Sequence, residues 1–244
     1  MKRSPLELTL IIPAYNEQQL ICSNLKVLLN FLEKRNSNFE ILVVDDGSLD
    51  RTVQVVGDFS EDHSQVRLIK QPQNLGKGLA IQRGVRESKG KYIIFMDADL
   101  PYELNALNAF MDTLISGSDL VIGSRHLEGS LVKDVPPIRY FIGQVFSLLV
   151  SLLIFPGVRD TQCGLKGFKE EAARNIFQRT TISRFGIDVE VLFIARKFKY
   201  SISQLPVKMT GFRNDSRVHV VMDSIRMFLD LFRIRWNDIR GAYN

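Results

Sequence analysis

Short apolar runs alternate, over the first half of the chain, with longer segments whose apolar residues recur at helical spacing. Such runs are typical of strands covered on both faces, and the helical spacing is typical of helices with one buried face. We expect strands at residues 8–12, 39–44, 66–69, 92–96 and 120–122. The expected helices are one with Ile21, Leu25, Leu28 and Leu32 on one face, and others at residues 50–59, 75–86 and 104–114. This alternation predicts an α/β fold with a mostly parallel central sheet and helices on both faces.

The pattern changes after residue 125. An apolar segment at residues 138–155 is stopped by Pro156 and Gly157, and a further strand is expected near residues 202–209. The last helix carries an apolar face that we expect to be first a packing surface and only second a membrane contact: Val221, Ile225, Phe228, Phe232 and Trp236. Because no linker rich in Pro, Gly or Ser interrupts the chain, we expect one domain over residues 1–244.

Composition narrows the class of ligand only a little. The formal charge of +5 and the isoelectric point of about 9.2 suit a phosphate-bearing ligand or an anionic membrane surface. The charge is too small to indicate nucleic acid, and we expect no nucleic-acid partner. Cys22 and Cys163 stand in unrelated contexts, so neither a disulfide framework nor a zinc site is indicated. His63, His126 and His219 lack the spacing of metal ligands or of a catalytic triad.

Polar residues follow three of the expected strands, as PAYNE (13–17), DDGS (45–48) and DAD (97–99). Ligands of such sheets bind beyond the carboxyl ends of the strands. Asp97 and Asp99 suit a divalent cation that bridges a nucleotide diphosphate, because Mg²⁺ commonly binds one or two carboxylates together with substrate phosphates. An acidic turn is the alternative for an isolated pair of this kind.

The DDGSLD segment also follows a buried strand. Asp45 and Asp46 are candidates to accept hydrogen bonds from a base or a ribose, whereas Ser48 or Asp50 is expected to cap the next helix. Helix capping alone explains Ser48 and Asp50, but it does not explain two consecutive acids at the end of a strand.

The glycine-rich segment at residues 74–84, NLGKGLAIQRG, fits neither common phosphate-loop pattern. Gly78 follows Lys77 where the Walker pattern needs Ser or Thr, and Ile81 stands where the dinucleotide fingerprint needs Gly. The glycines are expected to let a helix begin close to the nucleotide. Lys77 is then either a contact to that nucleotide or a solvated lysine.

Taken in order and at these spacings, PAYNE, VVDDGSLD, NLGKGLA, MDADLPYE and GSR resemble the motifs of family 2 inverting glycosyltransferases with the nucleotide-diphospho-sugar-binding (GT-A) fold. DTQCGLKGF and RNDSRV resemble segments of the polyprenyl-phosphate hexosyltransferases, which are the dolichyl-phosphate glucose and mannose synthases and their bacterial relatives. The resemblance covers about residues 6 to 235. It implies a nucleotide-sugar-binding half at 6–125 and an acceptor-binding half at 126–244 with amphipathic interfacial helices.

The resemblance also implies roles for single residues. Asp97 and Asp99 would hold Mg²⁺ or Mn²⁺, and the residues implied in catalysis are Asp97, Asp99, Asp160 and Arg125. The residues implied in nucleotide-sugar binding are Pro13, Tyr15, Glu17, Asp45, Asp46, Ser48, Lys77, Asp97, Ala98, Asp99 and Arg213. The residues implied in gripping the acceptor phosphate are Arg125, Arg139, Lys166 and Arg217, with Asp160 and Cys163 in the same acceptor-side motif.

Two positions depart from the pattern of the family. Pro101 stands where the mannose synthases have Gln, which removes one expected metal contact, and Lys166 stands where Arg is common, which loses bidentate phosphate geometry. A lipid phosphate already carries an ionised oxygen, so we expect no residue to be an obligatory proton acceptor. Asp160 would then mainly organise the cations on the acceptor side.

The resemblance favours UDP-glucose as donor and a polyprenyl phosphate (dolichyl or undecaprenyl) as acceptor, with a β-linked product. GDP-mannose is the second choice of donor. Two other readings stay open at this point: a transferase of the same fold with a different acceptor, and a nucleotide-sugar-binding scaffold without activity.

Residues 140–158 carry no charge and reach the length of a spanning helix. A single span would, however, put Lys166 across the bilayer from Asp99, and polar residues recur along the segment at helical spacing, namely Tyr140, Gln144, Ser147 and Ser151. We therefore expect a helix that lies in the membrane interface, with a buried core helix as the alternative. Glu7 and Pro13 interrupt the apolar start of the chain, so we expect no signal peptide. The expected location is the cytoplasmic face of a membrane, peripherally bound, with a separate integral membrane protein as a further candidate partner.

Overall fold

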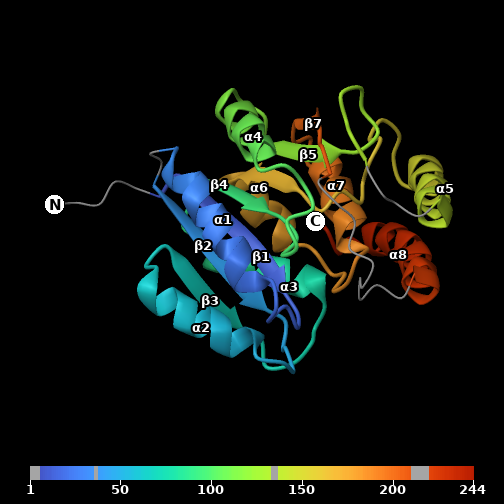
Figure 1. The fold of residues 1–244 in the computed structure, drawn as a ribbon. Helices are drawn as coiled ribbons and strands as arrows, with labels where there is room; N and C mark the ends of the chain where they lie inside the picture. Colours follow the sequence, from blue (N-terminus) through green and yellow to red (C-terminus); the bar gives the residue numbers. More distant parts are fainter. Residues whose placement is uncertain (1–5, 36–37, 133–136, 210–219) are drawn as a thin grey trace.

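The computed structural model describes residues 6–35, 38–132, 137–209 and 220–244, and within them one sheet of seven strands forms the centre of the molecule (Figure 1). The strands are β1 Leu8–Ala14, β2 Phe39–Asp45, β3 Val66–Lys70, β4 Tyr92–Phe95, β5 Leu120–Ser124, β6 Lys166–Lys169 and β7 Ile202–Pro206. The helices are α1 Ile21–Glu33, α2 Thr52–Asp62, α3 Lys77–Glu87, α4 Asn105–Ile115, α5 Pro137–Leu153, α6 Glu170–Phe177, α7 Ile187–Lys197 and α8 Val220–Ile239.

The strands and helices expected over the first half of the chain are confirmed, with small differences at their ends. The helix expected from residue 50 begins at Thr52, because the Asp50 side chain accepts the backbone N–H of Thr52 from outside the helix. The helix expected from residue 75 begins at Lys77, because the backbone N–H groups of Leu75 and Gly76 are bound by the Asp46 carboxylate. Local side-chain bonds of this kind compete with the first turn of a helix.

The order of strands in the sheet is β3-β2-β1-β4-β6-β5-β7. β6 runs antiparallel to both of its neighbours, β4 and β5, and the remaining pairs are parallel. The pattern of apolar residues did not predict β6, because this strand has four residues, KGFK, and two of them are lysines. A single domain over the whole chain remains a prediction, which is supported by this insertion of a second-half strand between two first-half strands.

Alternate residues of the central strands face two separate apolar cores, as expected for a sheet covered on both sides. Ile11 of β1 packs into the core that also holds buried residues of α3, α6 and α7, whereas Leu10 and Ile12 pack into the core shared with α1 and α4. β1 pairs in parallel with both β2 and β4. Because parallel neighbours end on the same side, the carboxyl ends of these three strands come together at one edge of the sheet, with the loops that follow them.

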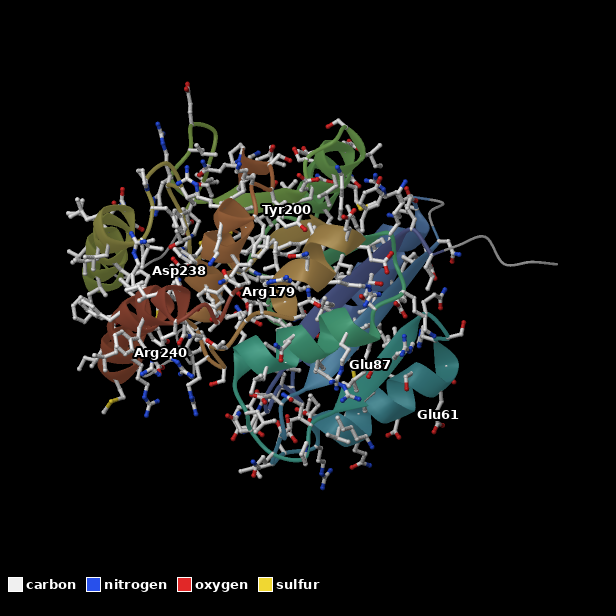
Figure 2. All side chains as sticks on the ribbon, turned by 180° about the vertical axis from the view of Figure 1, so that it is seen from behind. Glu61, Glu87, Arg179, Tyr200, Asp238 and Arg240 are labelled. Atoms are coloured by element: carbon white, nitrogen blue, oxygen red, sulfur yellow. The ribbon has the colours of Figure 1, made fainter. Side chains whose placement is uncertain are left out.

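α5 and α8 lie side by side in both views and flank the core that also holds buried residues of α3, α6 and α7 (Figures 1 and 2). In α5, Phe146 and Val150 are buried, whereas Leu148 and Leu152 are exposed over 59% and 72% of their area. α5 thus packs against the protein on one side only. The alternative of a core helix is wrong for the side that carries Leu148 and Leu152. No helix among the described residues is long and apolar enough to cross a membrane.

The expected packing of the last helix is wrong. α8 packs inward through Leu231 and Ile234, whereas Phe232 and Trp236 of the expected packing face are exposed over 52% and 53% of their area. A polar residue one turn after the buried ones also faces the protein: Asn237 donates a hydrogen bond to the Thr181 hydroxyl at 2.9 Å. We call the exposed apolar side chains of the two helices the α5–α8 apolar surface: Val145, Leu148, Leu152, Met222, Ile225, Phe228, Leu229, Phe232, Trp236 and Ile239.

Candidate functional site

The loops after β1 and β2 are held together by hydrogen bonds that centre on Asn16. The Asn16 backbone N–H donates to Ser48 Oγ at 2.8 Å, and Asn16 Oδ1 accepts the backbone N–H of Leu49 at 2.6 Å. Asn16 adopts a positive φ of 55°, a conformation that asparagine tolerates better than most residues. Its role was missed in the sequence, although its place in PAYNE was a signal. Ser48 thus binds the neighbouring loop, and Asp50 rather than Ser48 bonds the start of α2.

The two consecutive carboxylates at the end of β2 have different surroundings. Asp46 accepts hydrogen bonds from Gln71 Nε2 and from the backbone N–H groups of Leu75 and Gly76. Burial raises the pKa of Asp46, against the lowering effect of the Leu75 and Gly76 amides. Because its oxygens are already occupied by the protein, the prediction that Asp46 lines the base pocket is not favoured by this geometry.

Asp45 differs from Asp46 in having one oxygen to offer. Its Oδ2 accepts the backbone N–H groups of Gly47 and Ser48, each at 3.1 Å. Its Oδ1 is buried and has no hydrogen-bond partner among the described residues. An unpartnered buried acceptor is costly unless a ligand supplies a donor. Asp45 is therefore the better candidate of the two for contact with a bound nucleotide.

Asp97 and Asp99 follow β4 at the same edge of the sheet. Asp97 Oδ1 accepts a hydrogen bond from Lys77 Nζ at 2.5 Å, in an ion pair whose side chains are 34% and 17% exposed, respectively. The backbone of Gly164 lies against the other oxygen, since a Cβ at Gly164 would be 1.9 Å from Asp97 Oδ2. Asp99 is exposed. The expected pair of carboxylates is thus present, but a lysine occupies one oxygen of the pair.

The donor groups at this edge fit a divalent cation that is shared with a diphosphate. No group of three or more His, Cys, Asp or Glu residues gathers in the described part of the chain, so no cage made by protein alone is present there. Mg²⁺, however, is commonly bound by one or two carboxylates and completed by substrate phosphates and water. Asp97 already carries one cation, the Lys77 ammonium, which is direct evidence that this carboxylate attracts positive charge.

Arg125 and Asp160 form a two-pronged ion pair beyond the end of β5. Arg125 Nε and Nη2 donate to the two oxygens of Asp160 at 2.7 and 2.8 Å, and the Arg125 backbone N–H donates at 2.9 Å. Burial acts to raise the pKa of Asp160, but the hydrogen bonds and charge of Arg125 outweigh it and hold that pKa below its ordinary value. Arg125 keeps about a third of its side chain in solvent, so it is oriented by Asp160 and can still meet a phosphate.

Lys166 lies in the interior rather than at the surface of the site. It is ion-paired with Asp188 of α7, it donates to the Cys163 carbonyl at 2.7 Å, and its side chain has no exposed area. Direct contact between Lys166 and an acceptor phosphate remains a prediction, which this burial does not favour. Asp188 was missed in the sequence, although its place in the largely apolar stretch at residues 187–195 was a signal.

Two polar atoms beside Asp160, Thr161 Oγ1 and Gln162 Nε2, are buried without a hydrogen-bond partner in the part of the chain that the structure describes. Cys163 is fully buried, and burial raises the pKa of its thiol to about 11, so it is not a nucleophile at neutral pH. The hydroxyl of Tyr102 accepts the backbone N–H of Gly164 at 3.3 Å, which connects the segment after Asp99 to the DTQCG segment.

The other residues expected in the site have less definite positions. Pro13, Tyr15 and Glu17 are partly exposed at the end of β1, and the carbonyl of Ala98 accepts a hydrogen bond from Asn24 Nδ2 at 2.8 Å. Arg213 and Arg217 lie outside the described residues, as does the side chain of Arg139. Their expected roles remain predictions.

The sequence matches the family model Glycosyl transferase family 2 over residues 9–177. The dolichyl-phosphate beta-glucosyltransferase of Dictyostelium discoideum is 37% identical over 97% of this chain and 76% of its own length. The human enzyme of that name is 33% identical over 97% of this chain and 77% of its own length. Glucosyl-3-phosphoglycerate synthase of Mycobacterium tuberculosis in complex with UDP superposes with a TM-score of 0.70, at 19% identity, over 94% of this chain and 80% of that chain. The latter protein has also been crystallised with Mn²⁺, UDP-glucose and phosphoglyceric acid, in a form with a TM-score of 0.67 at 17% identity that covers 98% of this chain and 80% of that chain.

Proposed function

Because the chain belongs to glycosyl transferase family 2 and has the GT-A fold, we propose that it transfers glucose from UDP-glucose to a dolichyl phosphate with inversion at the sugar. The observation that carries this proposal is the identity of 32% to 37% with dolichyl-phosphate beta-glucosyltransferases over almost the whole chain. No observation favours GDP-mannose or a scaffold without activity over this function.

The donor would bind at the ends of β1, β2 and β4. Asp45 would accept a hydrogen bond from the base, since its Oδ1 is buried and needs a donor. Asp97 and Asp99 would hold a divalent cation, and that cation would neutralise negative charge on the diphosphate as it leaves. Arg213 is proposed as a further contact to the diphosphate.

The acceptor phosphate would bind at Arg125, which Asp160 holds in one orientation through two hydrogen bonds. One ionised oxygen of the lipid phosphate attacks the anomeric carbon of glucose from the face opposite UDP. The new C–O bond forms as the bond to the diphosphate breaks, and UDP leaves with the electron pair. No proton has to be removed, so alignment of the reacting atoms and neutralisation of charge are the work of the protein.

The α5–α8 apolar surface would rest on the membrane that contains the lipid acceptor. Its exposed aromatic and aliphatic side chains stand among arginines of α8 and of the residue that follows it, namely Arg226, Arg233, Arg235 and Arg240. Arg240 and Asp238 lie at the end of α8 (Figure 2), and the Arg240 guanidinium stacks over the Trp236 ring at 4.5 Å. Apolar side chains beside basic ones are typical of helices that bind an anionic membrane interface. We propose the cytoplasmic face, where nucleotide sugars are available.

Transfer of radiolabelled glucose tests the reaction. Purified protein with labelled UDP-glucose, Mn²⁺ and dolichyl phosphate is expected to move label into the butanol phase, and the product is expected to be the β-anomer by NMR. Dolichol without its phosphate is the matched acceptor control, and labelled GDP-mannose is the donor control. Label that reaches butanol from GDP-mannose alone, or without a lipid phosphate, would contradict the proposal.

Flotation with phospholipid vesicles tests the membrane contact. The wild-type protein is expected to float with vesicles that contain phosphatidylserine, and the double variant Phe232→Ser/Trp236→Ser is expected to stay at the bottom. Val27→Ser/Ile115→Ser is the matched control, because these side chains are equally exposed on α1 and at the end of α4. Equal flotation of all three proteins would argue against this surface.

A further inference from the structure

Lys77 is the first residue of α3, and its ammonium is bound to one of the two carboxylates that fit a divalent cation. Lys77 Nζ and Asp97 Oδ1 are 2.5 Å apart and form a charge-assisted hydrogen bond. Because the backbone of Gly164 lies against Oδ2, a divalent cation at Asp97 would compete with the lysine for Oδ1, and the two cannot both hold that oxygen in this geometry.

The backbone around Lys77 fixes where its side chain begins. The Gly76 N–H donates to Asp46 Oδ2 at 2.9 Å, and the Gly78 N–H donates to the Ser183 carbonyl at 2.8 Å. Neither glycine has room for a side chain, since a Cβ at either position would lie within 3 Å of the Ser183 carbonyl oxygen. Lys77 is thus held between two anchored residues, and only its flexible side chain is able to move.

Negative charge surrounds the Lys77 ammonium. Burial acts to lower the pKa of Lys77, but Asp97, Asp188 and Asp99 outweigh it and hold that pKa well above its ordinary value. A lysine ammonium is ordinarily charged at neutral pH. If a metal ion displaced it from Asp97 and nothing else arrived, a partly buried ammonium would lose its bonded partner, which is costly.

We propose that Lys77 occupies the cation position on Asp97 until a nucleoside diphosphate brings both a divalent cation and a new anionic partner for the lysine. This inference rests on the donor half of the proposed function. The diphosphate accepts the displaced ammonium, and the cation takes the oxygen that the ammonium has left. Metal and donor then bind with positive coupling, and the empty enzyme has little affinity for free metal.

Titration of Mn²⁺ followed by the EPR signal of the free ion tests this exchange without any measurement of turnover. For the wild-type protein we expect Mn²⁺ to bind about tenfold more tightly, or better, when UDP is saturating. In Lys77→Met, Mn²⁺ is expected to bind the protein alone about tenfold more tightly than it binds the wild type, and the gain from UDP is expected to shrink by the same factor.

Three variants serve as controls. Lys77→Arg keeps a cation and is expected to keep the weak binding of Mn²⁺ alone. Lys26→Met removes an exposed lysine of α1 and is expected to change nothing. Thermal unfolding checks that each variant is folded. If Lys77→Met is not, Lys77→Gln repeats the test with a polar side chain.

Two results would overturn the inference. One is a Lys77→Met or Lys77→Gln protein that binds Mn²⁺ alone no better than the wild type. The other is a wild-type protein that binds Mn²⁺ equally well with and without UDP. The proposed function is tested separately. Positive coupling between Mn²⁺ and UDP without glucose transfer to dolichyl phosphate would refute the function only. Glucose transfer by the wild type, with the same coupling in Lys77→Met as in the wild type, would refute this inference only.

Discussion

Two lysine–aspartate pairs lie on either side of the DTQCG segment, and they differ in their access to solvent. Lys77–Asp97 is partly open to solvent at the end of β4, whereas Lys166–Asp188 is closed off beneath it. A buried pair cannot exchange partners with a ligand, because each charge would be left alone in the interior. A partly exposed pair can, because water and ligand phosphates can replace either partner. The same two residue types thus supply a contact that we propose to be exchangeable on the proposed donor side, and a structural one under the proposed acceptor side.

The difference extends to the rest of the two sides. The proposed donor side, the loops after β1, β2 and β4, consists of segments that are bonded to one another, as Asn16 is to Ser48. It has a buried Asp45 oxygen without a hydrogen-bond partner among the described residues, and an exposed Asp99. On the acceptor side each described cation of the site is already held by its own carboxylate, as Arg125 is by Asp160. We infer that ligands supply the positive charge that neutralises the carboxylates of the donor side. On the acceptor side, the protein supplies both charges of each ion pair.

The largest effect is expected from breaking the buried pair. Lys166→Met leaves Asp188 uncompensated and is expected to lower the free energy of unfolding by about 3–5 kcal/mol, whereas Lys77→Met is expected to cost about 1 kcal/mol or less. Urea denaturation measures both. The double variant Lys166→Met/Asp188→Leu is expected to recover most of the loss, since no charge remains unpaired. Equal losses in the two single variants would remove the distinction between the pairs.

A loss of activity without loss of stability is expected on the donor side. Asp99→Asn is expected to lower kcat/KM for glucose transfer by about a hundredfold, in the range for loss of one group that stabilises charge in the transition state. Asp99 is exposed, so the unfolding free energy is expected to stay within about 0.5 kcal/mol of the wild type. Asp112→Asn, at an exposed acid of α4, is the matched control. Full activity in Asp99→Asn would exclude the proposed metal role.

A smaller and more selective effect is expected from Asp160→Asn. Without the carboxylate, Arg125 loses its two-pronged partner, and the KM for dolichyl phosphate is expected to rise about tenfold while the KM for UDP-glucose stays constant. Initial-rate kinetics with each substrate varied in turn separates the two constants. A fall in kcat with both KM values unchanged would instead point to a proton acceptor at Asp160.

The smallest effect concerns the packing of α8 beside the acceptor side. Burial raises the pKa of Asp230 to about 6, against the opposing effect of Arg233. A carboxyl whose pKa is higher in the folded state stabilises that state below its unfolded pKa, and this contribution is lost as pH rises through about 6. Asp230→Asn is therefore expected to be more stable than wild type by about 1 kcal/mol at pH 7.5 and no more stable at pH 4. Thermal unfolding at the two pH values measures this; an advantage that does not change with pH would contradict it.

The donor side was the more predictable of the two from sequence. Its carboxylates follow strands whose apolar runs are unmistakable, so the topology alone brings Asp45 and Asp97 to one edge. Sequence patterns could not tell Asp45 from Asp46. The two differ in that the loop at residues 71–76 donates hydrogen bonds to the carboxylate of Asp46, which only the folded structure shows. The ion pair between Lys77 and Asp97 was not predicted either, because the sequence left two equal interpretations of Lys77, as a nucleotide contact or as a solvated side chain.

The acceptor side was less predictable because its partners come from distant elements. Asp188 meets Lys166 only once α7 packs beneath β6, and a strand of four residues with two lysines gives no apolar pattern. The exposed side of α8 was assigned inward for a different reason. The apolar face that recurs at helical spacing was expected to pack, whereas the helix buries Leu231 and Ile234 and leaves Phe232 and Trp236 exposed.

The position of β6 has a consequence for the way the protein is made. A nascent chain leaves the ribosome from its first residue, and β4 is complete long before residue 166 has been added. Until then the edge of β4 that β6 will cover has unpaired backbone groups, which are prone to join other chains. The sheet is therefore completed late in synthesis. Until β6 has been made, the first half of the chain has an exposed strand edge that favours aggregation.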